Sequence, residues 1–383
     1  MHGPLHGVRV VELAAIGPVP YGVMLLADLG AEVIRVDRAS AATGQPSAEA
    51  SMVGVSRNRR SVAVDLKHPE GVEVVRRLTA AADVFVEGFR PGVAERLGLG
   101  PNQLCGAHPG LIYARVTGWG QQGPLAARAG HDLDYAAVAG ALHGIGRPDE
   151  PPPPPINYLA DFAGGGAFLA IGVLAALVER ERSGEGQVID AAMLDGTASL
   201  TAFLHGLRGL GAWSNERGSN LLDGAAPFYD TYACADGGFL AVAALEPQFH
   251  AQLCAGLGLD PAEWPQHDPS LWPEQKARLA DVLATRTREE WMEVFADSDA
   301  CVAPVLDLEE APSHPHNRAR GTFVKAFDRV QPAPAPRFSR TPGSIDRPPP
   351  EPGEHTDAVL AVLGYDVEER AALRAAGAVA DQG

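Results

Sequence analysis

Three places with acid or base side chains stand out because each one lies next to turn residues. His131 and Asp132 share the stretch GHDLDY at 130–135, just before the small apolar run AAVAGAL. Asp161 lies in ADFAGGG, and Glu246 lies in ALEPQ. The sequence contains neither the metal-ligand pattern H-E-x-x-H nor the nucleophile motif G-x-S-x-G. One histidine with several carboxylates favours chemistry in which a proton is abstracted and returned.

Each of these groups also has an interpretation that involves no chemistry. Asp132 can cap a helix, with His131 as a hydrogen-bonded neighbour, and Asp161 can be the N-cap of the apolar helix that follows it. Glu246 can be a surface acid placed by the proline after it. The apolar run after His131 is expected to be buried in either case.

The charge of the chain is distributed unevenly. The net charge is −17, which excludes a general nucleic-acid binder. The first hundred residues hold 11 basic and 11 acidic side chains, whereas the remaining 283 hold 20 basic and 37 acidic ones. The basic side chains near the N-terminus include Arg38, Arg59, Arg90 and Arg96. They form either a solvated face or a place for an anionic ligand.

Cysteine usage and apolar content indicate where the protein works. Four cysteines lie far apart without a CxxC pair, which argues for a reducing compartment and against structural zinc. The longest apolar run, 167–178, has twelve residues, so it is predicted to be a buried helix rather than a bilayer span. No signal peptide is recognisable at the N-terminus. We expect a soluble, cytoplasmic protein that binds no membrane.

The order of elements predicts an α/β fold. Apolar strands at 8–13, 31–37, 61–66, 83–89 and 111–119 alternate with helical segments, which is typical of a parallel, Rossmann-like sheet. The first turn, AAIGPVPYG, lacks G-x-G-x-x-G and carries prolines where a dinucleotide needs amides, so an NAD site is disfavoured.

The length of 383 residues predicts two domains. We expect a large α/β domain at 1–200, a linker at 201–225 and a small α+β domain at 226–325 with a hairpin turn at CADGG. Residues 326–383 are expected to return and to pack a C-terminal helix on the large domain. The proline run within 147–156 is predicted to be a rigid spacer.

Several motifs together resemble the family III CoA-transferase superfamily, and within it the α-methylacyl-CoA racemases. They are LGAEVIRVDR, RNRRSVAVDLK, EGFRPGVAERLGLG, YARVTGWGQQGP, GHDLDY, NYLADFAGGG, GQVIDAAMLDG and YDTYACADG. The resemblance covers nearly the whole chain. It implies an acyl-CoA substrate, a role in fatty acid and lipid metabolism, and an interlocked homodimer. The active sites of such a dimer lie between the large domain of one subunit and the small domain of the other.

The resemblance also assigns roles to individual residues. It implies that His131 and Asp161 are the two catalytic bases and that Glu246, from the other subunit, pairs with the histidine. Asp132 and Asn157 match further active-site positions. The basic residues expected around the CoA phosphates and adenine are Arg38, Arg59, Arg90 and Arg96. No metal and no cofactor beyond the substrate's own CoA is implied, and the polar tract 40–56 is expected to gate the CoA site.

The chemistry of such an enzyme explains why these residue types are needed. Interconverting (R)- and (S)-2-methylacyl-CoA thioesters by 1,1-proton transfer requires one acid–base group on each face of the α-carbon. Histidine ordinarily has a pKa of about 6.5, whereas a carboxyl group must have its pKa raised by burial. Backbone amides at the helix that opens in GHDLDY are suited to stabilise the enolate between the two steps.

Three other functions compete with the racemase. A family III CoA transferase would use Asp161 as a nucleophile and would have no need of a basic histidine at position 131. A CoA-binding protein without catalysis would need none of the three acid–base groups. An NAD-dependent oxidoreductase is disfavoured by the missing glycine motif.

Overall fold

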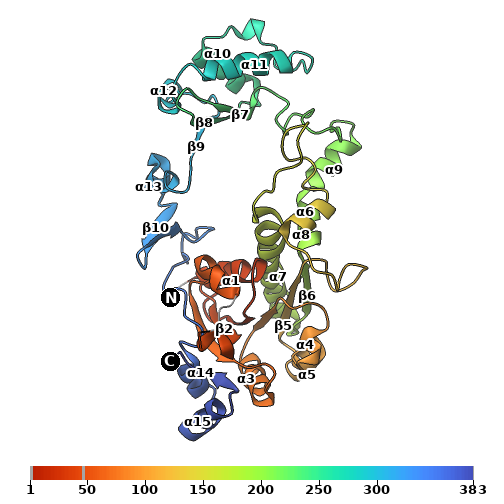
Figure 1. The fold of residues 1–383 in the computed structure, drawn as a ribbon, viewed down its shortest axis with the longest axis vertical. Helices are drawn as coiled ribbons and strands as arrows, with labels where there is room; N and C mark the ends of the chain where they lie inside the picture. The colour runs from red at the N-terminus through yellow and green to blue at the C-terminus, as the bar shows by residue number, and fades with distance from the viewer. Residues whose placement is uncertain (1–2, 45–47, 383) are drawn as a thin grey trace. The chain divides into compact units, whose positions relative to one another are not determined.

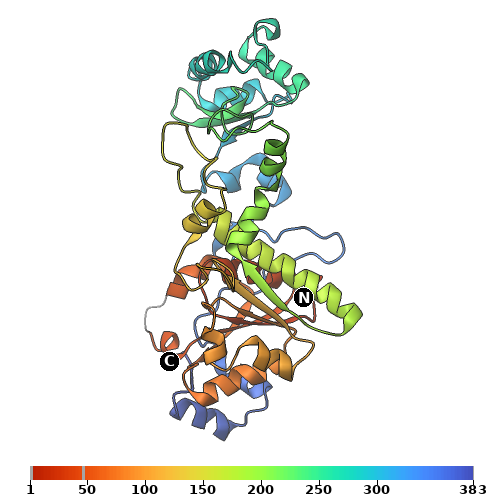
Figure 2. The same ribbon diagram turned by 90° about the vertical axis from the view of Figure 1, so that its right-hand side faces the viewer.

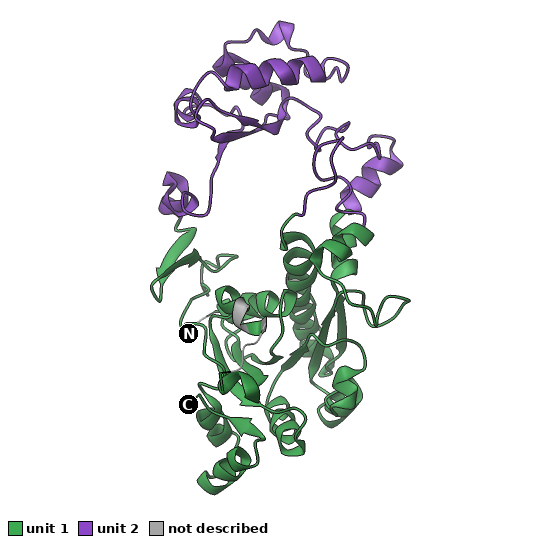
Figure 3. Cartoon of the chain, in the orientation of Figure 1, with its two compact units in different colours: residues 1–139, 155–201, 321–383 green, residues 140–154, 202–320 purple. Residues whose placement is uncertain are grey.

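A computed structural model describes residues 3–44 and 48–382 of the chain. The chain divides into two compact units, shown in different colours in Figure 3. Unit 1 comprises residues 1–139, 155–201 and 321–383, and unit 2 comprises residues 140–154 and 202–320. The middle of the polar tract expected to act as a gate, residues 45–47, lies outside the described residues.

Unit 1 is built on a seven-stranded sheet of order β12-β3-β2-β1-β4-β5-β6. Its strands are β1 (Arg9–Leu13), β2 (Glu32–Arg38), β3 (Arg59–Val64), β4 (Val84–Glu87), β5 (Ile112–Thr117), β6 (Val188–Ala192) and β12 (Val379–Ala380). The strands β1 to β6 are all parallel, whereas the two-residue β12 pairs antiparallel with β3 at one edge. Apart from β12, this is the doubly wound order of Rossmann folds, so the prediction of an α/β fold with a parallel sheet is confirmed.

Helices cover both faces of this sheet (Figures 1 and 2). One face carries α1 (Pro18–Asp28) and α7 (Phe168–Ser183), and the other carries α3 (Pro69–Ala80), α5 (Pro101–Ala107), α14 (Thr356–Val362) and α15 (Val367–Ala375). Because side chains alternate along a strand, Val10 joins the first core and Val11 the second. Val84 likewise packs in the first core and Phe85 in the second.

The remaining elements of unit 1 lie in its connections. They are α2 (Ala39–Ala42), the 3₁₀ segment η1 (Ala48–Val55), α4 (Val93–Arg96), α6 (Asp132–Val138), the π-helix η2 (Tyr158–Ala167), α8 (Met193–Leu200), and the hairpin of β10 (Phe323–Ala326) and β11 (Arg329–Pro332). The π-helix continues directly into α7. No sequence pattern indicated a π-helix, because AGGGA is a poor helix-forming run.

Unit 2 has its own antiparallel sheet and core. The strands β7 (Tyr229–Ala233), β8 (Phe239–Ala243) and β9 (Val302–Val305) form the sheet. Its helical elements are α9 (Ala202–Gly209), α10 (Pro247–Leu257), η3 (Pro261–Glu263), α11 (Trp272–Leu283), α12 (Arg288–Val294), η4 (Ala311–Ser313) and α13 (Pro315–Arg320). The predicted hairpin at CADGG joins β7 to β8.

The structure differs from the sequence-based prediction in two domain borders and in the elements of the C-terminal segment. The proline-rich segment 140–154 belongs to unit 2, and so does 202–225, which contains α9 rather than only a linker. The C-terminal segment forms two helices and the edge strand β12, not a single helix. These short elements were missed because each has too few residues to show a hydrophobic period.

Two apolar runs are less buried than expected. Helix α7 buries Leu169 and Val173 in the core, but Ile171 and Val178 are each 57% exposed in the single chain. Together with the π-helix it forms the only described segment, Tyr158–Ser183, long and apolar enough to cross a membrane. The run after His131 is only partly buried, since Ala136 is buried but Val138 is 59% exposed. Neither run is covered on all sides in the single chain.

Candidate active site

The strand order of unit 1 reverses between β1 and β4, and the loops after these two strands meet. In open α/β sheets this reversal creates a crevice at the carboxyl ends of the strands. Gly88 follows β4, and a Cβ added there would lie 3.0 Å from Val19 Cγ2 and 3.3 Å from Ala15 Cβ in the first loop. The candidate catalytic residues gather beside these loops.

Asp161 lies in the first turn of the π-helix, against the loop after β1. Gly17, the residue before α1, has a φ of +70°, and a Cβ added to it would lie 2.9 Å from Asp161 Oδ2. Glycine is therefore required at position 17 both for its backbone conformation and for the approach of the carboxyl group. The N–H of Gly17 donates to the Met52 sulfur at 3.4 Å, so η1 also reaches this place.

Asp132 connects α6 to the π-helix. Its Oδ1 atom accepts hydrogen bonds from the backbone N–H groups of Ala160 at 2.7 Å and Asp161 at 2.6 Å. Asp132 is thus a cap, as its alternative interpretation held, but it caps the π-helix and not its own helix. Asn157 Nδ2 donates to Asp161 Oδ2 at 3.5 Å, and Asp161 itself is not an N-cap.

His131 precedes α6 and completes this group. Its backbone N–H donates to Asp134 Oδ2 at 2.9 Å, and its side chain is exposed. Burial, and after it the negative charge of Asp132, together raise the pKa of Asp161 to about 6. The hydrogen bond from Asn157 and the charge of His131 oppose this rise, which shows that all four side chains share one electrostatic environment.

Tyr135 belongs to the same environment, although sequence reasoning did not select it. The ring packs edge-on against Trp119 with centroids 4.7 Å apart, and a Cβ on Gly130 would lie 2.7 Å from its Cε1 atom. Burial, followed by the charge of Asp161, raises the pKa of Tyr135 to about 12, and Arg90 acts in the opposite direction. Tyr135 is the last residue of the motif GHDLDY, and its position in that motif is the sequence feature that could have identified it.

A pocket of about 630 Å³ lies along the carboxyl ends of β1, β2 and β3. Arg38 lines it together with Lys67, a cation that sequence reasoning missed although it directly follows the strand SVAVDL. Phe89, Val93 and Leu97 supply its wall from the segment after β4. Arg90 and Arg96 are exposed on this same segment. The pocket is large enough for a nucleotide-sized ligand.

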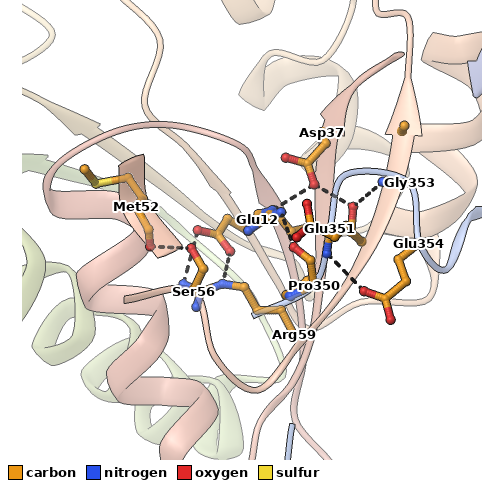
Figure 4. A network of polar contacts seen from close by, with 12 residues as sticks. Glu12, Asp37, Met52, Ser56, Arg59, Pro350, Glu351, Gly353 and Glu354 are labelled. Atoms are coloured by element: carbon orange, nitrogen blue, oxygen red, sulfur yellow. Dashed lines mark hydrogen bonds and ion pairs between the residues drawn. The ribbon is translucent and has the colours of Figure 1, made fainter. Parts of the chain in front are cut away.

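Arg59 differs from the expectation that it binds a phosphate. It is 1% exposed, and its Nε atom donates to Glu12 Oε2 at 2.6 Å. Its remaining donors reach Glu12 Oε1 and the carbonyl oxygens of Val55, Arg57 and Pro20. Figure 4 shows the buried network around this pair. All five N–H groups are used inside the fold, so Arg59 is a structural residue here.

Glu246 is placed in unit 2, so it is not among the residues that unit 1 brings together. It directly precedes α10 and is exposed, and its carbonyl oxygen accepts from the His250 N–H at 3.0 Å. Its side chain forms no cap hydrogen bond to α10. Its role therefore stays a prediction.

Among the described residues, no three His, Cys, Asp or Glu side chains gather as metal ligands.

Comparisons with known proteins agree with this arrangement. The sequence profile of the family described as CoA-transferase family III matches residues 5–356. The α-methylacyl-CoA racemase of Mus musculus is 50% identical over 95% of this chain and 94% of the mouse protein. The racemase of the same name from Homo sapiens is 48% identical over the same shares. The crystal structure of a CAIB/BAIF family protein from Brucella suis has a TM-score of 0.81 and 28% identity, covering 95% of this chain and 100% of that one.

Proposed function

Because this chain belongs to CoA-transferase family III, we propose that it is an α-methylacyl-CoA racemase. The mouse and human racemases support this reaction, since nearly their whole length aligns with this chain at about half identity. The reaction is the interconversion of (R)- and (S)-2-methylacyl-CoA thioesters by 1,1-proton transfer.

The observation that carries the proposal is the environment shared by His131 and Asp161. A carboxyl group with a pKa of about 6 can both give and take a proton near neutral pH, which an ordinary aspartate does poorly. The histidine supplies a second group of this kind. A transferase needs only an ionised carboxylate, so the presence of both groups favours the racemase.

The proposed steps use these two groups on opposite faces of the α-carbon. One group removes the α-proton of the thioester, and the electron pair of the C–H bond moves onto the carbonyl oxygen as an enolate. The other group then delivers its proton to the opposite face of the carbon, which inverts the configuration. Each epimer thus meets a different base. The Glu246 carboxylate of the other subunit is proposed to orient the imidazole and to balance its charge.

The CoA part of the substrate is proposed to occupy the pocket at the carboxyl ends of β1 to β3. Arg38 and Lys67 line this pocket, and Arg90 and Arg96 are exposed on the segment that forms its wall. Such cations suit the phosphates of CoA. Arg59 is not part of this proposal.

The active site is proposed to need no metal or further cofactor, so dialysis against EDTA should leave the rate of racemisation unchanged.

We further propose a cytoplasmic homodimer in which each active site combines both subunits. The exposed apolar side chains of α7 and α9 support an interface between copies, since Phe203 is 62% and Ile171 57% exposed. In this arrangement Glu246 reaches the His131 of the partner chain.

Proton NMR of a 2-methylacyl-CoA thioester in D2O tests the reaction. The enzyme should introduce deuterium at the α-carbon and scramble the configuration of either epimer. With His131→Ala, the epimer whose proton faces Asp161 should still exchange with retained configuration, while inversion is lost from both sides. With Asp161→Asn, the other epimer should exchange.

The same experiment separates the competing functions. A single base serving both faces would lose exchange of both epimers in one variant and of neither in the other. A CoA transferase would introduce no α-deuterium and would exchange acyl groups onto an added free acid through Asp161. Either result would contradict the racemase.

A further inference from the structure

Asp132 is held in an unusual way between two helices. One oxygen, Oδ1, accepts the N–H groups of both Ala160 and Asp161, at 2.7 and 2.6 Å. The other oxygen, Oδ2, is buried and has no hydrogen-bond partner. Buried carboxylate oxygens nearly always accept a hydrogen bond. The missing donor at Asp132 Oδ2 therefore calls for an explanation.

This geometry buries the Asp132 carboxylate inside unit 1. The residue is only 6% exposed, its Oδ1 is fully engaged, and its Oδ2 is not accessible to solvent. Asp161 is partly exposed and His131 is exposed, so both can reach a ligand in the crevice. A proton-transfer role for Asp132 would require the first turn of the π-helix to open.

The same geometry places the charge of Asp132 next to Asp161. The carboxylate is hydrogen-bonded to the backbone of the residue whose side chain does the chemistry, one turn from Asn157. A negative charge close to a carboxyl group disfavours the ionised form of that group. In agreement, Asp132 is the second-largest cause of the raised pKa of Asp161, after burial.

We propose that Asp132 is a positioning residue: one of its oxygens fixes the first turn of the π-helix, and its charge stands beside Asp161 without exchanging a proton with the substrate. The inference rests on the proposed function only in taking Asp161 as an acid–base group. In this proposal His131 exchanges a proton with the substrate, whereas Asp132, the next residue in the motif, does not. Asp132 thereby links the helix that carries one base to the helix that carries the other.

The variant Asp132→Asn tests this role, because the amide oxygen can still accept both N–H groups while the charge is lost. Asp161 is followed directly, without substrate, by ¹³C NMR of the protein labelled at aspartate carboxyl carbons. Its signal is assigned as the one missing from Asp161→Asn. In Asp132→Asn the titration midpoint of Asp161 should move to lower pH by about half a pH unit or more, because a like charge is removed. Asp132→Ser, a smaller side chain that keeps an oxygen acceptor, should move it in the same direction.

A matched control is Asp195→Asn. Asp195 is an exposed acid in the first turn of α8, and its charge is not among the causes of the Asp161 shift. This control should leave the Asp161 midpoint where it is. An unchanged or raised midpoint in Asp132→Asn and Asp132→Ser would overturn the proposal.

Turnover supplies a second readout. The acid limb of kcat/KM should move to lower pH in Asp132→Asn for both epimers alike, because the ratio of kcat/KM in the two directions equals the equilibrium constant of the racemisation, which does not depend on pH. A merely structural role would lower the rate without moving this limb. If the NMR midpoint moves but the wild-type protein racemises no 2-methylacyl-CoA, the positioning role stands and the proposed function fails.

Discussion

The raised pKa of Asp161 has a consequence for stability. A carboxyl group whose folded pKa is raised from 3.8 to about 6 favours folding while it is protonated and opposes folding once it ionises. The contribution of the protonated Asp161 to the free energy of unfolding is therefore fully present below about pH 4. It is lost as the pH rises from about 4 towards 6, and it is absent above pH 6. This penalty is on the order of 2 kcal/mol at neutral pH for this half-buried side chain.

Asp161→Asn should therefore no longer invert the substrate, yet it should be more stable than the wild type at pH 7.5. Urea unfolding at pH 7.5 should show a gain on the order of 2 kcal/mol, and the difference should vanish near pH 4. A variant less stable at pH 7.5 would show that the carboxylate is favourably solvated in the folded protein.

Two of the arginines expected from the sequence to bind CoA should respond differently to replacement by alanine. Arg59→Ala leaves Glu12 buried without its partner, so it should cost about 3–5 kcal/mol of unfolding free energy. Arg38 has a side chain that is 70% exposed, and Arg38→Ala should leave Tm unchanged while raising KM for acyl-CoA several-fold. Thermal unfolding and steady-state kinetics distinguish the two. If Arg59→Ala is as stable as the wild type and has a raised KM for acyl-CoA, Arg59 binds CoA and is not a structural residue.

At the scale of elements, glycines determine how closely the π-helix can pack. A Cβ added to Gly166 would lie 2.7 Å from Tyr21 Cδ1 and 2.8 Å from the Pro18 carbonyl oxygen, and one added to Gly22 would lie 2.5 Å from the Gly166 carbonyl oxygen. The helix carrying Asp161 thus touches the backbone of α1 directly.

Gly166→Ala should cost about 1–3 kcal/mol and displace Asp161, because backbone atoms cannot move aside as a flexible side chain can. Gly106 in α5 is the matched control, since no atom lies within 4 Å of a Cβ added there. Gly106→Ala should be neutral or slightly stabilising. Denaturant unfolding together with racemisation rates checks both variants, and equal behaviour of the two would refute the packing argument.

The elements also show what the sequence could predict. The strands of the parallel sheet were recognisable because both of their faces are buried, as in Val84–Glu87, which makes them short continuous apolar runs. The edge strand Val379–Ala380 was not recognisable, because two residues carry no period and their pairing with β3 is entirely non-local. The exposed apolar face of α7 could not be predicted, since its composition is that of a buried helix.

The candidate site was predictable in part for similar reasons. The motifs located His131, Asp132, Asn157 and Asp161, and the structure brings these four together. Charge alone could not separate Arg59 from Arg38, because burial of an arginine depends on a partner such as Glu12 that is distant in sequence. Tyr135 and Lys67 were missed because a tyrosine in a helix and a lysine after a strand are common in any fold.

At the scale of the whole molecule, the proposed shared active site predicts complementation between inactive chains. His131→Ala and Glu246→Ala should each be strongly impaired. A mixed dimer of the two should regain activity, because one of its two sites then combines an intact His131 with an intact Glu246. Co-expression with two different affinity tags, followed by an assay of the doubly purified dimer, measures this. His131→Ala with Asp161→Ala is the control, since both changes lie in unit 1 and no intact site can form. A monomeric protein, or equal recovery in both pairs, would contradict the shared site.

Unit 1 is assembled from three separate stretches of chain, and the last of them, 321–383, supplies α14, α15 and β12. Val359, Leu360 and Leu373 from this stretch pack in the same core as Val11 and Phe85. During translation, therefore, the ribosome must synthesise all of unit 2 before the second face of the seven-stranded sheet, already lined by α3 and α5, can be covered completely. Unit 2 can complete its core while the nascent unit 1 is still open, so the part of the protein that is synthesised first is the part that finishes folding last.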